Sequence, residues 1–237
     1  MALKLKIKKR LHYFDMDLFL SCDDGRMLVL IGPSGGGKTT LIRMLAGLSL
    51  PDEGRIVFGG ETWFDSSRKI NVPPQRRRIG YVFQEYTLFP HLNLHDNAAF
   101  AAVDKKEVAD LLELFGIAHL AGRKPHLVSG GERQRCALCQ ALARRPRMLL
   151  LDEPFSALDV ITRRGLREKL KSLKRKFDFP ILYVTHDIGE ALFLADEILP
   201  IVDGRIDRGW MQRTITPEPA TGYPARATRE PRLALAY

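Results

Sequence analysis

The sequence predicts an α/β fold around a mostly parallel β-sheet. Short β-rich apolar runs alternate with helical patterns, and turn residues separate them. The runs Met148 to Leu151 and Ile181 to Thr185 are apolar throughout, which is typical of strands buried on both faces. With 45% hydrophobic and 27% charged residues among 237, the composition is that of a globular protein and not of a disordered or fibrous one.

The first part of the chain contains clear strand and helix patterns. Met27 to Ile31 is a candidate buried strand, and Lys38 to Gly47 is a candidate helix. A further strand, Gly54 to Gly59, ends at the turn Gly59-Gly60. We expect the N-terminal segment and residues 54–83 to form an antiparallel β region.

The alternation of predicted strands and helices stops in the middle of the chain. Between Asn93 and Ala143 no strand pattern occurs, whereas apolar residues recur at helical spacing between Lys105 and Phe115. Residues 90–143 are therefore predicted to form a helical subdomain, inserted before the sheet resumes. Residues 1–210 form the predicted domain. Residues 211–237 are rich in Pro and Arg and lack periodicity, so we expect a largely disordered tail.

The formal net charge of +9 is concentrated in one segment. Between Thr162 and Lys176 eight basic side chains stand against one acidic side chain. Leu166, Leu170 and Leu173 recur there at helical spacing, which predicts an amphipathic helix. Its basic face is expected to be solvated, with attraction to an anionic membrane surface as the alternative.

The cysteine content and the hydropathy of the sequence predict where the protein is located in the cell. No apolar run approaches the ~20 residues that cross a bilayer, and the N-terminus alternates Leu or Ile with Lys. The three cysteines are odd in number, and Cys136 and Cys139 lack the partners of a zinc site. We expect a cytoplasmic protein without a cysteine-bound metal.

A glycine-rich loop between the first buried strand and the first helix is the strongest chemical signal. It matches the phosphate-loop pattern and comprises Gly32, Pro33, Ser34, Gly35, Gly36, Gly37, Lys38 and Thr39. Its backbone N–H groups and the following helix N-terminus suit an anion. Lys38 is expected to neutralise the β- and γ-phosphates of ATP and Thr39 to ligate Mg²⁺, while Thr40 continues the helix and is counted with the nucleotide-binding residues.

A strand that ends in two carboxylates supplies the other groups that ATP hydrolysis needs. The apolar run from Met148 ends in Asp152 and Glu153. Asp152 is expected to hold Mg²⁺. Glu153 would orient and polarise the water that attacks the γ-phosphate.

Further motifs carry a family resemblance. Val128 to Arg135 resembles the signature motif of ATP-binding cassette (ABC) ATPases, with Val128 and Glu132 as variants. Gln84, the segment Ser156 to Asp159 and His186 resemble the Q-loop, D-loop and switch histidine of that family. The resemblance covers about residues 3–210 and implies a P-loop NTPase cassette.

The resemblance also implies roles for these residues. Two cassettes would pack head to tail as a homodimer, so that Ser129, Gly130, Gly131 and Glu132 of one cap the γ-phosphate held by the other. Ser129 and Glu132 also fit a helix capping box, and the two roles are compatible.

Gln84 would reach the metal or the attacking water, and His186 would contact the γ-phosphate and Glu153. Asp159 would link the two sites across the dimer, or cap a helix that begins near Val160. Tyr13 and Phe14 are both candidates for adenine stacking. Gln140 stands where the family commonly has Arg.

Two function classes remain. The first is the peripheral motor subunit of a transporter on the cytoplasmic face of the membrane, with a permease docked against the helical insert and residues 85–97, and with a substrate-binding protein as an indirect partner. The second is a soluble ABC ATPase acting on nucleic acid or in translation. The sequence has one intact cassette and no coiled-coil heptads, which favours transport and a protein that does not bind nucleic acid.

Within transporters, the segment Val72 to Gln84 resembles importer ATPases. Trp63 to Ser66 is most similar to molybdate importers, with sulfate, tungstate, iron or polyamine as alternative cargo.

Overall fold

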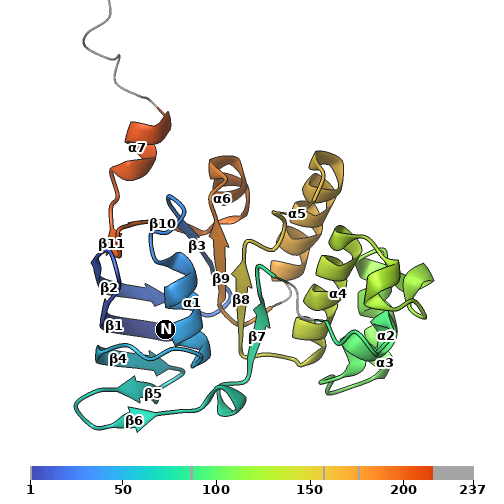
Figure 1. Cartoon of the computed structure of the whole chain (residues 1–237), viewed down its shortest axis with the longest axis horizontal. Coiled ribbons are helices and arrows are strands. Elements are labelled where there is room, and N and C mark those ends of the chain that lie inside the picture. Colours follow the sequence, from blue (N-terminus) through green and yellow to red (C-terminus); the bar gives the residue numbers. More distant parts are fainter. Residues whose placement is uncertain (1, 86–87, 157, 176, 216–237) are drawn as a thin grey trace, which may run out of the picture.

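Two β-sheets organise the chain in the computed structural model, one antiparallel and one mostly parallel (Figure 1). The structure describes residues 2–85, 88–156, 158–175 and 177–215. Helices lie between and beside the sheets, and a group of helices forms the right-hand side of the view in Figure 1. The α/β fold with a parallel core, an antiparallel region and a helical insert is therefore confirmed.

The antiparallel sheet has the strand order β2-β1-β4-β5-β6. Along β1, the side chains Leu3, Leu5 and Ile7 are buried while the lysines between them are exposed. This alternation is typical of a sheet that covers a core with one face only. The strands are β1 (Leu3–Arg10), β2 (Asp15–Cys22), β4 (Glu53–Phe58), β5 (Glu61–Asp65) and β6 (Ile70–Asn71).

The mostly parallel sheet has the order β11-β10-β3-β9-β8-β7, and only the β10–β11 pair is antiparallel. The strands β3, β8 and β9 are buried at every position, as predicted. Their bounds are β3 (Met27–Ile31), β7 (Ile79–Val82), β8 (Met148–Asp152), β9 (Ile181–Thr185), β10 (Glu197–Val202) and β11 (Arg205–Ile206).

One boundary prediction is wrong. The antiparallel region was expected to reach residue 83, but it ends at Asn71, and β7 pairs in parallel with β8. The reason is that β7 buries both of its faces. Ile79 packs into the core shared with the antiparallel sheet, while Val82 packs into the core under the other helices.

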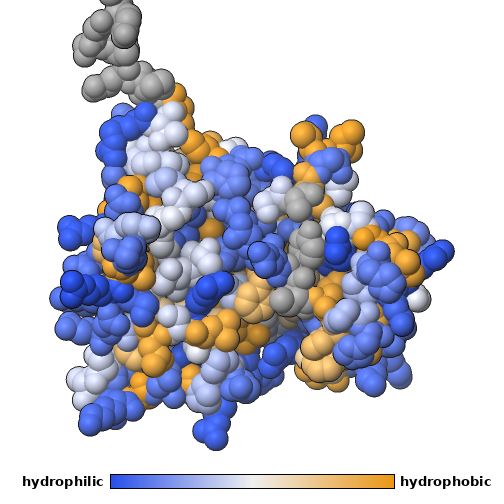
Figure 2. Space-filling model, in the orientation of Figure 1, coloured by the Kyte–Doolittle hydropathy of each residue, from blue (hydrophilic) through white to orange (hydrophobic). Residues whose placement is uncertain are grey.

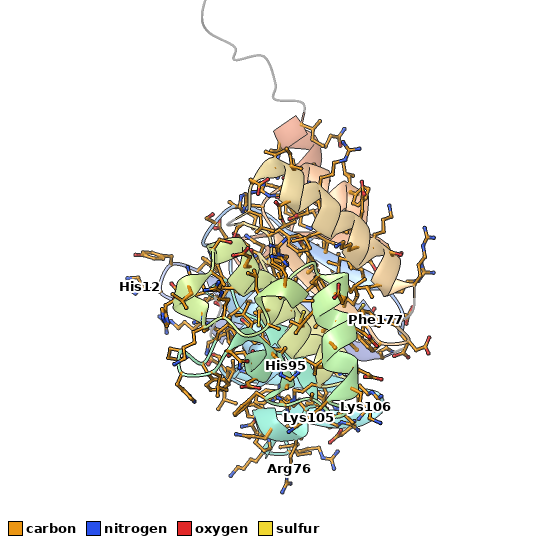
Figure 3. The ribbon with its side chains drawn as sticks, turned by 90° about the vertical axis from the view of Figure 1, so that its right-hand side faces the viewer. His12, Arg76, His95, Lys105, Lys106 and Phe177 are labelled. Atoms are coloured by element: carbon orange, nitrogen blue, oxygen red, sulfur yellow. The ribbon has the colours of Figure 1, made fainter. Side chains whose placement is uncertain are left out.

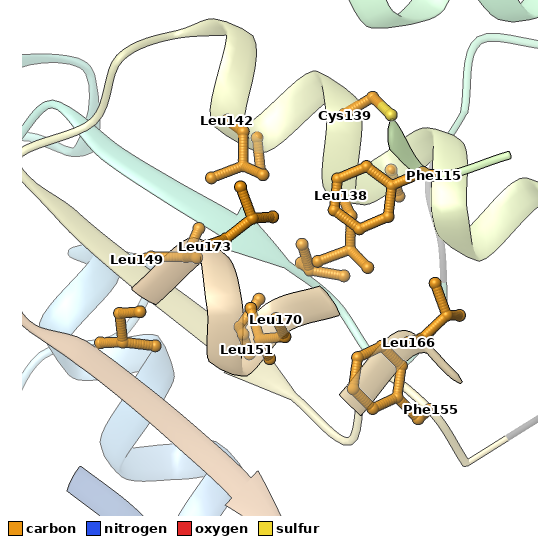
Figure 4. Close-up of a cluster of buried hydrophobic side chains, with 14 of the residues drawn as sticks. Phe115, Leu138, Cys139, Leu142, Leu149, Leu151, Phe155, Leu166, Leu170 and Leu173 are labelled. Carbon is orange, nitrogen blue, oxygen red and sulfur yellow. The ribbon is translucent and has the colours of Figure 1, made fainter. Parts of the chain in front are cut away.

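The parallel sheet separates two hydrophobic cores. In β3, Leu28 and Leu30 pack with the antiparallel sheet and α1 (Lys38–Ala46). Met27, Val29 and Ile31 pack into the other core, with α4 (Gly130–Ala143), α5 (Val160–Lys174) and α6 (Ile188–Leu194). Figure 4 shows this second core between β8, α4 and α5. Consequently α1 and α4 lie on opposite faces of one sheet.

The helical insert is confirmed for residues 93–143, all of which the structure describes and none of which form a strand. It contains α2 (Leu94–Ala99), α3 (Lys106–Leu114), short 3-10 turns at Ala118–Leu120 and Pro125–Leu127, and α4. At the other end of the chain, α7 (Trp210–Ile215) extends past the predicted domain boundary at 210. The rest of the predicted tail, residues 216–237, lies outside the described residues.

The basic helix α5 differs in part from its prediction. Leu166, Leu170 and Leu173 are buried, as expected. The basic side chains are not all solvated, because Arg167 and Lys174, which flank the leucine stripe, are only 18% and 15% exposed and form ion pairs with Asp187, Glu190 and Asp196 outside α5.

Arg77 holds the end of α1 in place. Its side chain lies just before β7 and is buried, and Nη1 donates to the carbonyl oxygens of Met44 and Leu45 at 2.8 and 2.7 Å. Nε donates to the carbonyl oxygen of Val72 at 2.9 Å. Burial lowers the pKa of the guanidinium to about 10. Its positive charge at the helix C-terminus compensates carbonyls that have no partner within the helix. A 3-10 turn, Pro74–Arg76, leads into this position.

We predict that Arg77→Met lowers the free energy of unfolding by about 3 kcal/mol, because buried carbonyl oxygens lose a charged donor. Urea unfolding followed by circular dichroism measures this. Arg76→Met is the matched control, since Arg76 is exposed and points away from the molecule (Figure 3). Equal stability of the two variants would contradict this role of Arg77.

Candidate nucleotide-binding and hydrolysis site

The glycine-rich loop connects β3 to α1, as predicted. Gly32 has a φ of 145°, and a Cβ atom there would lie 2.1 Å from the carbonyl oxygen of Ile201. Gly37 precedes the first residue of α1 with a φ of 97°. Only glycine suits such positions. Pro33, Ser34 and Gly35 are exposed at the rim of the loop, so that a phosphate chain could reach it.

Lys38 lies inside this loop and is 5% exposed. Its Nζ donates to the carbonyl oxygens of Gly32 and Pro33 at 2.9 and 2.8 Å. Burial lowers the pKa of the amine, against the opposing effect of Glu153 and Asp152. The ammonium group thus lies at the N-terminus of α1, where it can pair with phosphate oxygens.

Thr39 and Asp152 form the candidate metal site. Thr39 Oγ1 donates to Asp152 Oδ1 at 3.1 Å, and the Tyr81 hydroxyl donates to Asp152 Oδ2 at 3.4 Å. Burial raises the pKa of Asp152, and these hydrogen bonds oppose the shift. Among the described residues no cluster of three or more His, Cys, Asp or Glu could hold a metal. A hydroxyl beside a carboxylate still fits Mg²⁺, which commonly takes few protein ligands and completes its shell with phosphates and water.

Glu153 and His186 form a pair at the carboxyl edge of the sheet. The distance from His186 Nδ1 to Glu153 Oε1 is 3.3 Å, and the His186 side chain is 60% exposed. Glu153 has a φ of 47°, which is unfavourable by ~1–2 kcal/mol for a residue with a Cβ atom. Its backbone N–H donates to Val184, and its carbonyl oxygen accepts from the Ser156 hydroxyl. This turn directs the Glu153 side chain toward the next strand end, where His186 lies.

Gln84 is not brought into contact with the candidate metal site. It follows β7 at the same edge of the sheet, but it is exposed and makes no hydrogen bond to any residue that the structure describes. Residues 86 and 87, which follow Glu85, lie outside the described residues. Its role as a ligand therefore stays a prediction.

The signature segment forms the predicted capping box at the start of α4. The Ser129 hydroxyl accepts from the N–H of Glu132, and Glu132 Oε2 accepts from the N–H of Ser129 at 2.7 Å. This second bond lowers the pKa of Glu132. A Cβ atom on Gly131 would lie 2.5 Å from Leu158 Cδ2, so glycine permits the close approach of the segment before α5. Ser129 is exposed and Gly130 is half-buried.

Asp159 is the N-cap of α5, as one of its two predicted roles requires. Its Oδ1 accepts from the N–H groups of Ile161 and Thr162 at 3.1 and 3.0 Å. A hydrogen bond from the Thr162 side chain, together with these two backbone bonds, holds the pKa of Asp159 below its usual range. Whether the residue also reaches a second copy stays a prediction.

The two adenine-stacking candidates have different surroundings. Tyr13 is 89% exposed and packs edge to face against His12. Phe14 instead packs behind the glycine-rich loop, since a Cβ atom on Gly37 would lie 3.5 Å from its ring. Tyr13 is therefore the ring free to meet a base.

Sequence reasoning missed two groups of residues around this site. Tyr81 donates to Asp152, and the alternation along β7 is too short to reveal it. The second group lies next to His186. Arg167 donates hydrogen bonds to Asp187 and Glu190, and Glu190 accepts a hydrogen bond from the Thr185 hydroxyl. These residues come from two distant segments, and no sequence motif joins them.

Comparison with known proteins shows the family of this chain. Residues 16–156 match the family described as ABC transporter. The chain belongs to this family. As an ABC ATPase, it hydrolyses ATP. Among the described residues of this ABC protein no helix is long and apolar enough to cross a membrane.

Two curated relatives of this ABC protein are import subunits. It is 45% identical to the molybdate/tungstate import ATP-binding protein of Archaeoglobus fulgidus, over 87% of this chain and 85% of that protein. It is 40% identical to the spermidine/putrescine import ATP-binding protein of Marinobacter nauticus, over 94% of this chain but only 59% of that longer protein. A solved dimeric ATP-binding cassette in a post-hydrolysis state with ADP and phosphate has a TM-score of 0.74 and 29% identity, covering 87% of this chain and 97% of that one.

We predict that Lys38→Ala abolishes ATP hydrolysis and weakens ATP binding at least tenfold, because it removes the charge nearest the β- and γ-phosphates. Phosphate release and binding of a fluorescent ATP analogue measure the two effects. Lys8→Ala, an exposed lysine of β1, is the control. Normal hydrolysis by folded Lys38→Ala would contradict the phosphate-loop assignment.

Proposed function

We propose that this chain is the motor subunit of an ABC importer, and that two copies close around two ATP molecules to drive a permease. One observation carries the proposal. The glycine-rich loop at α1 and the signature segment at α4 offer anion-binding N–H groups, but they lie on opposite faces of the parallel sheet. A single chain cannot bring both to one γ-phosphate, whereas a second copy can.

Each site residue has a role in this proposal. The loop from Gly32 to Gly37 and Lys38 bind the phosphates, with Tyr13 against the base. Thr39 and Asp152 hold Mg²⁺, with Gln84 approaching from the end of β7. When bound, Mg²⁺ neutralises developing charge on the phosphate oxygens. Glu153 accepts a proton from the attacking water, and His186 keeps the Glu153 carboxylate oriented.

Exposed apolar residues support contact with a second copy. Val160 and Ile161 are 80% and 85% exposed immediately after Asp159. Figure 2 shows hydrophobic side chains at the exposed uppermost end of α5. The comparison cassette is described as dimeric, in a state with ADP and phosphate. Burying these residues together with Ser129 and Gly130 suits an interface that forms around ATP.

A cleft between the sheet and the helical insert suits a permease segment. It has a volume of about 340 Å³ and lies between β7, the end of α1, and α2 with α4. Phe83, Phe89 and Phe100 line it, and Phe100 is 61% exposed. Gln140, where the family commonly has Arg, also lines this cleft. An amphipathic helix of a permease would bury these rings, holding the subunit peripherally on the cytoplasmic face of the membrane.

We assign molybdate or a related oxyanion as the cargo. Its support is the relative named for molybdate/tungstate import, which this chain matches over most of both lengths. The relative named for spermidine/putrescine import is slightly less similar and makes a cationic cargo the competing assignment. The substrate-binding protein and permease would select the cargo.

The dimer is tested by Glu153→Gln, which keeps the side-chain shape but removes the charge that activates water. We expect hydrolysis to slow at least a hundredfold with ATP binding retained. The variant should then run as a dimer with ATP and as a monomer with ADP in size-exclusion chromatography with light scattering.

Adding Ser129→Arg should abolish this dimer, because it places bulk and charge in the signature segment. Ser66→Arg, at an exposed serine at the end of β5, is the matched control and should leave the dimer intact. Monomeric Glu153→Gln with ATP at tens of micromolar would contradict closure around ATP.

Coupling to a permease is tested by Phe100→Asp. Basal hydrolysis should persist, while stimulation by the partner permease and its substrate-binding protein should be lost in proteoliposomes, because a charge is placed in the docking cleft. Phe19→Asp, at a similarly exposed phenylalanine of β2, is the control and should keep the stimulation.

The cargo is tested with the wild-type complex, whose hydrolysis molybdate, and not spermidine, should stimulate. Stimulation by spermidine alone would overturn the oxyanion assignment but not the docking site.

A further inference from the structure

Behind the switch histidine lies a network that connects α5 to α6. Arg167, on the second turn of α5, donates from Nε to Glu190 Oε1 at 2.8 Å and from Nη2 to Asp187 Oδ2 at 2.9 Å. The guanidinium therefore contacts two carboxylates at once, that of Glu190 in α6 and that of Asp187, the N-cap of α6. Such fork-like pairing fixes the relative orientation of its partners.

The same carboxylates hold the backbone on both sides of His186. Glu190 Oε2 accepts from the Thr185 hydroxyl at 2.5 Å, and that hydroxyl accepts from the N–H of Asp187 at 3.1 Å. Asp187 Oδ1 in turn accepts from the N–H of Glu190 at 2.8 Å. Residues 185 and 187 are thus tied together, and His186 is the residue between them.

Burial makes this network dependent on Arg167. Thr185 is 2% exposed and Glu190 is 4% exposed. A buried carboxylate that loses its cation must find another partner or draw in water, and either change moves the groups around it. His186, by contrast, is largely exposed, and its ring has the Glu153 carboxylate as its neighbour at 3.3 Å. The position of the His186 ring is therefore set by its backbone more than by its own packing.

We infer that Arg167 is a positioning residue for hydrolysis, which acts through Thr185, Asp187 and Glu190 to hold His186 against Glu153. Arg167 does not touch the nucleotide site. Because it lies on α5, whose N-cap is Asp159, the same contact links the helix that follows the D-loop to the switch histidine. This inference rests on the catalytic role proposed for His186.

A double-mutant cycle on kcat tests the inference. Arg167→Met removes both ion pairs and keeps much of the aliphatic stem. We expect it to lower kcat about tenfold or more, with KM for ATP changed less than twofold, since small displacements of catalytic groups have effects of this order. In a His186→Ala protein, Arg167→Met should lower kcat no further. Arg164→Met is the matched control, since Arg164 is 85% exposed on the same helix and, within the described residues, its ion pair is with Glu168.

Thr185→Val provides a second variant should Arg167→Met not fold. It removes the hydroxyl and keeps the branched shape, and it should lower kcat in wild type but not in His186→Ala. An equal loss of kcat in both backgrounds, or no loss at all from Arg167→Met or Thr185→Val, would overturn the inference while leaving the proposed function intact. Full activity of His186→Ala would contradict the proposed role of His186, and the inference with it.

Discussion

In β3, β8 and β9, successive side chains enter different hydrophobic cores, and the rest of the structure depends on this constraint. Leu28 and Leu30 face α1, whereas Val29 and Ile31 face the helices on the other side. A helix that packs on one face cannot also reach the other. The loop at the start of α1 and the signature segment at the start of α4 are therefore kept apart within one chain. In the proposed dimer a second molecule completes both anion sites, and closure would then depend on nucleotide.

The same alternation builds the candidate hydrolysis site. Met148 and Leu150 face α1, and Asp152 continues this series, so its carboxylate meets the Thr39 hydroxyl. Glu153 follows in a left-handed conformation and turns toward His186 at the end of β9. Two adjacent acidic residues thus acquire different neighbours, one the Thr39 hydroxyl and the other a histidine. The half-buried Arg167 links α5 to α6, and the buried Arg77 holds the end of α1.

Much of this could be predicted from the sequence because its signals are local. The glycine-rich loop, the doubly buried strands, the Ser129 capping box and the acidic end of β8 each lie within a few consecutive residues. The rest depends on long-range packing. β7 has too few residues to reveal its sheet, and the buried Arg77 and half-buried Arg167 look like surface charges in a basic sequence. Gln84 is exposed after the end of β7, and its role as a ligand stays a prediction.

In the proposed dimer each ATP site is shared between two copies. The most direct measurement mixes two chains that both carry Glu153→Gln, one with Lys38→Ala and the other with Ser129→Arg. In a mixed dimer one site combines both defects, while the other joins an intact loop to an intact signature segment. We predict one retained ATP per mixed dimer after gel filtration, and none for either chain alone. No retained ATP in the mixture would contradict shared sites, as would retention by either chain alone.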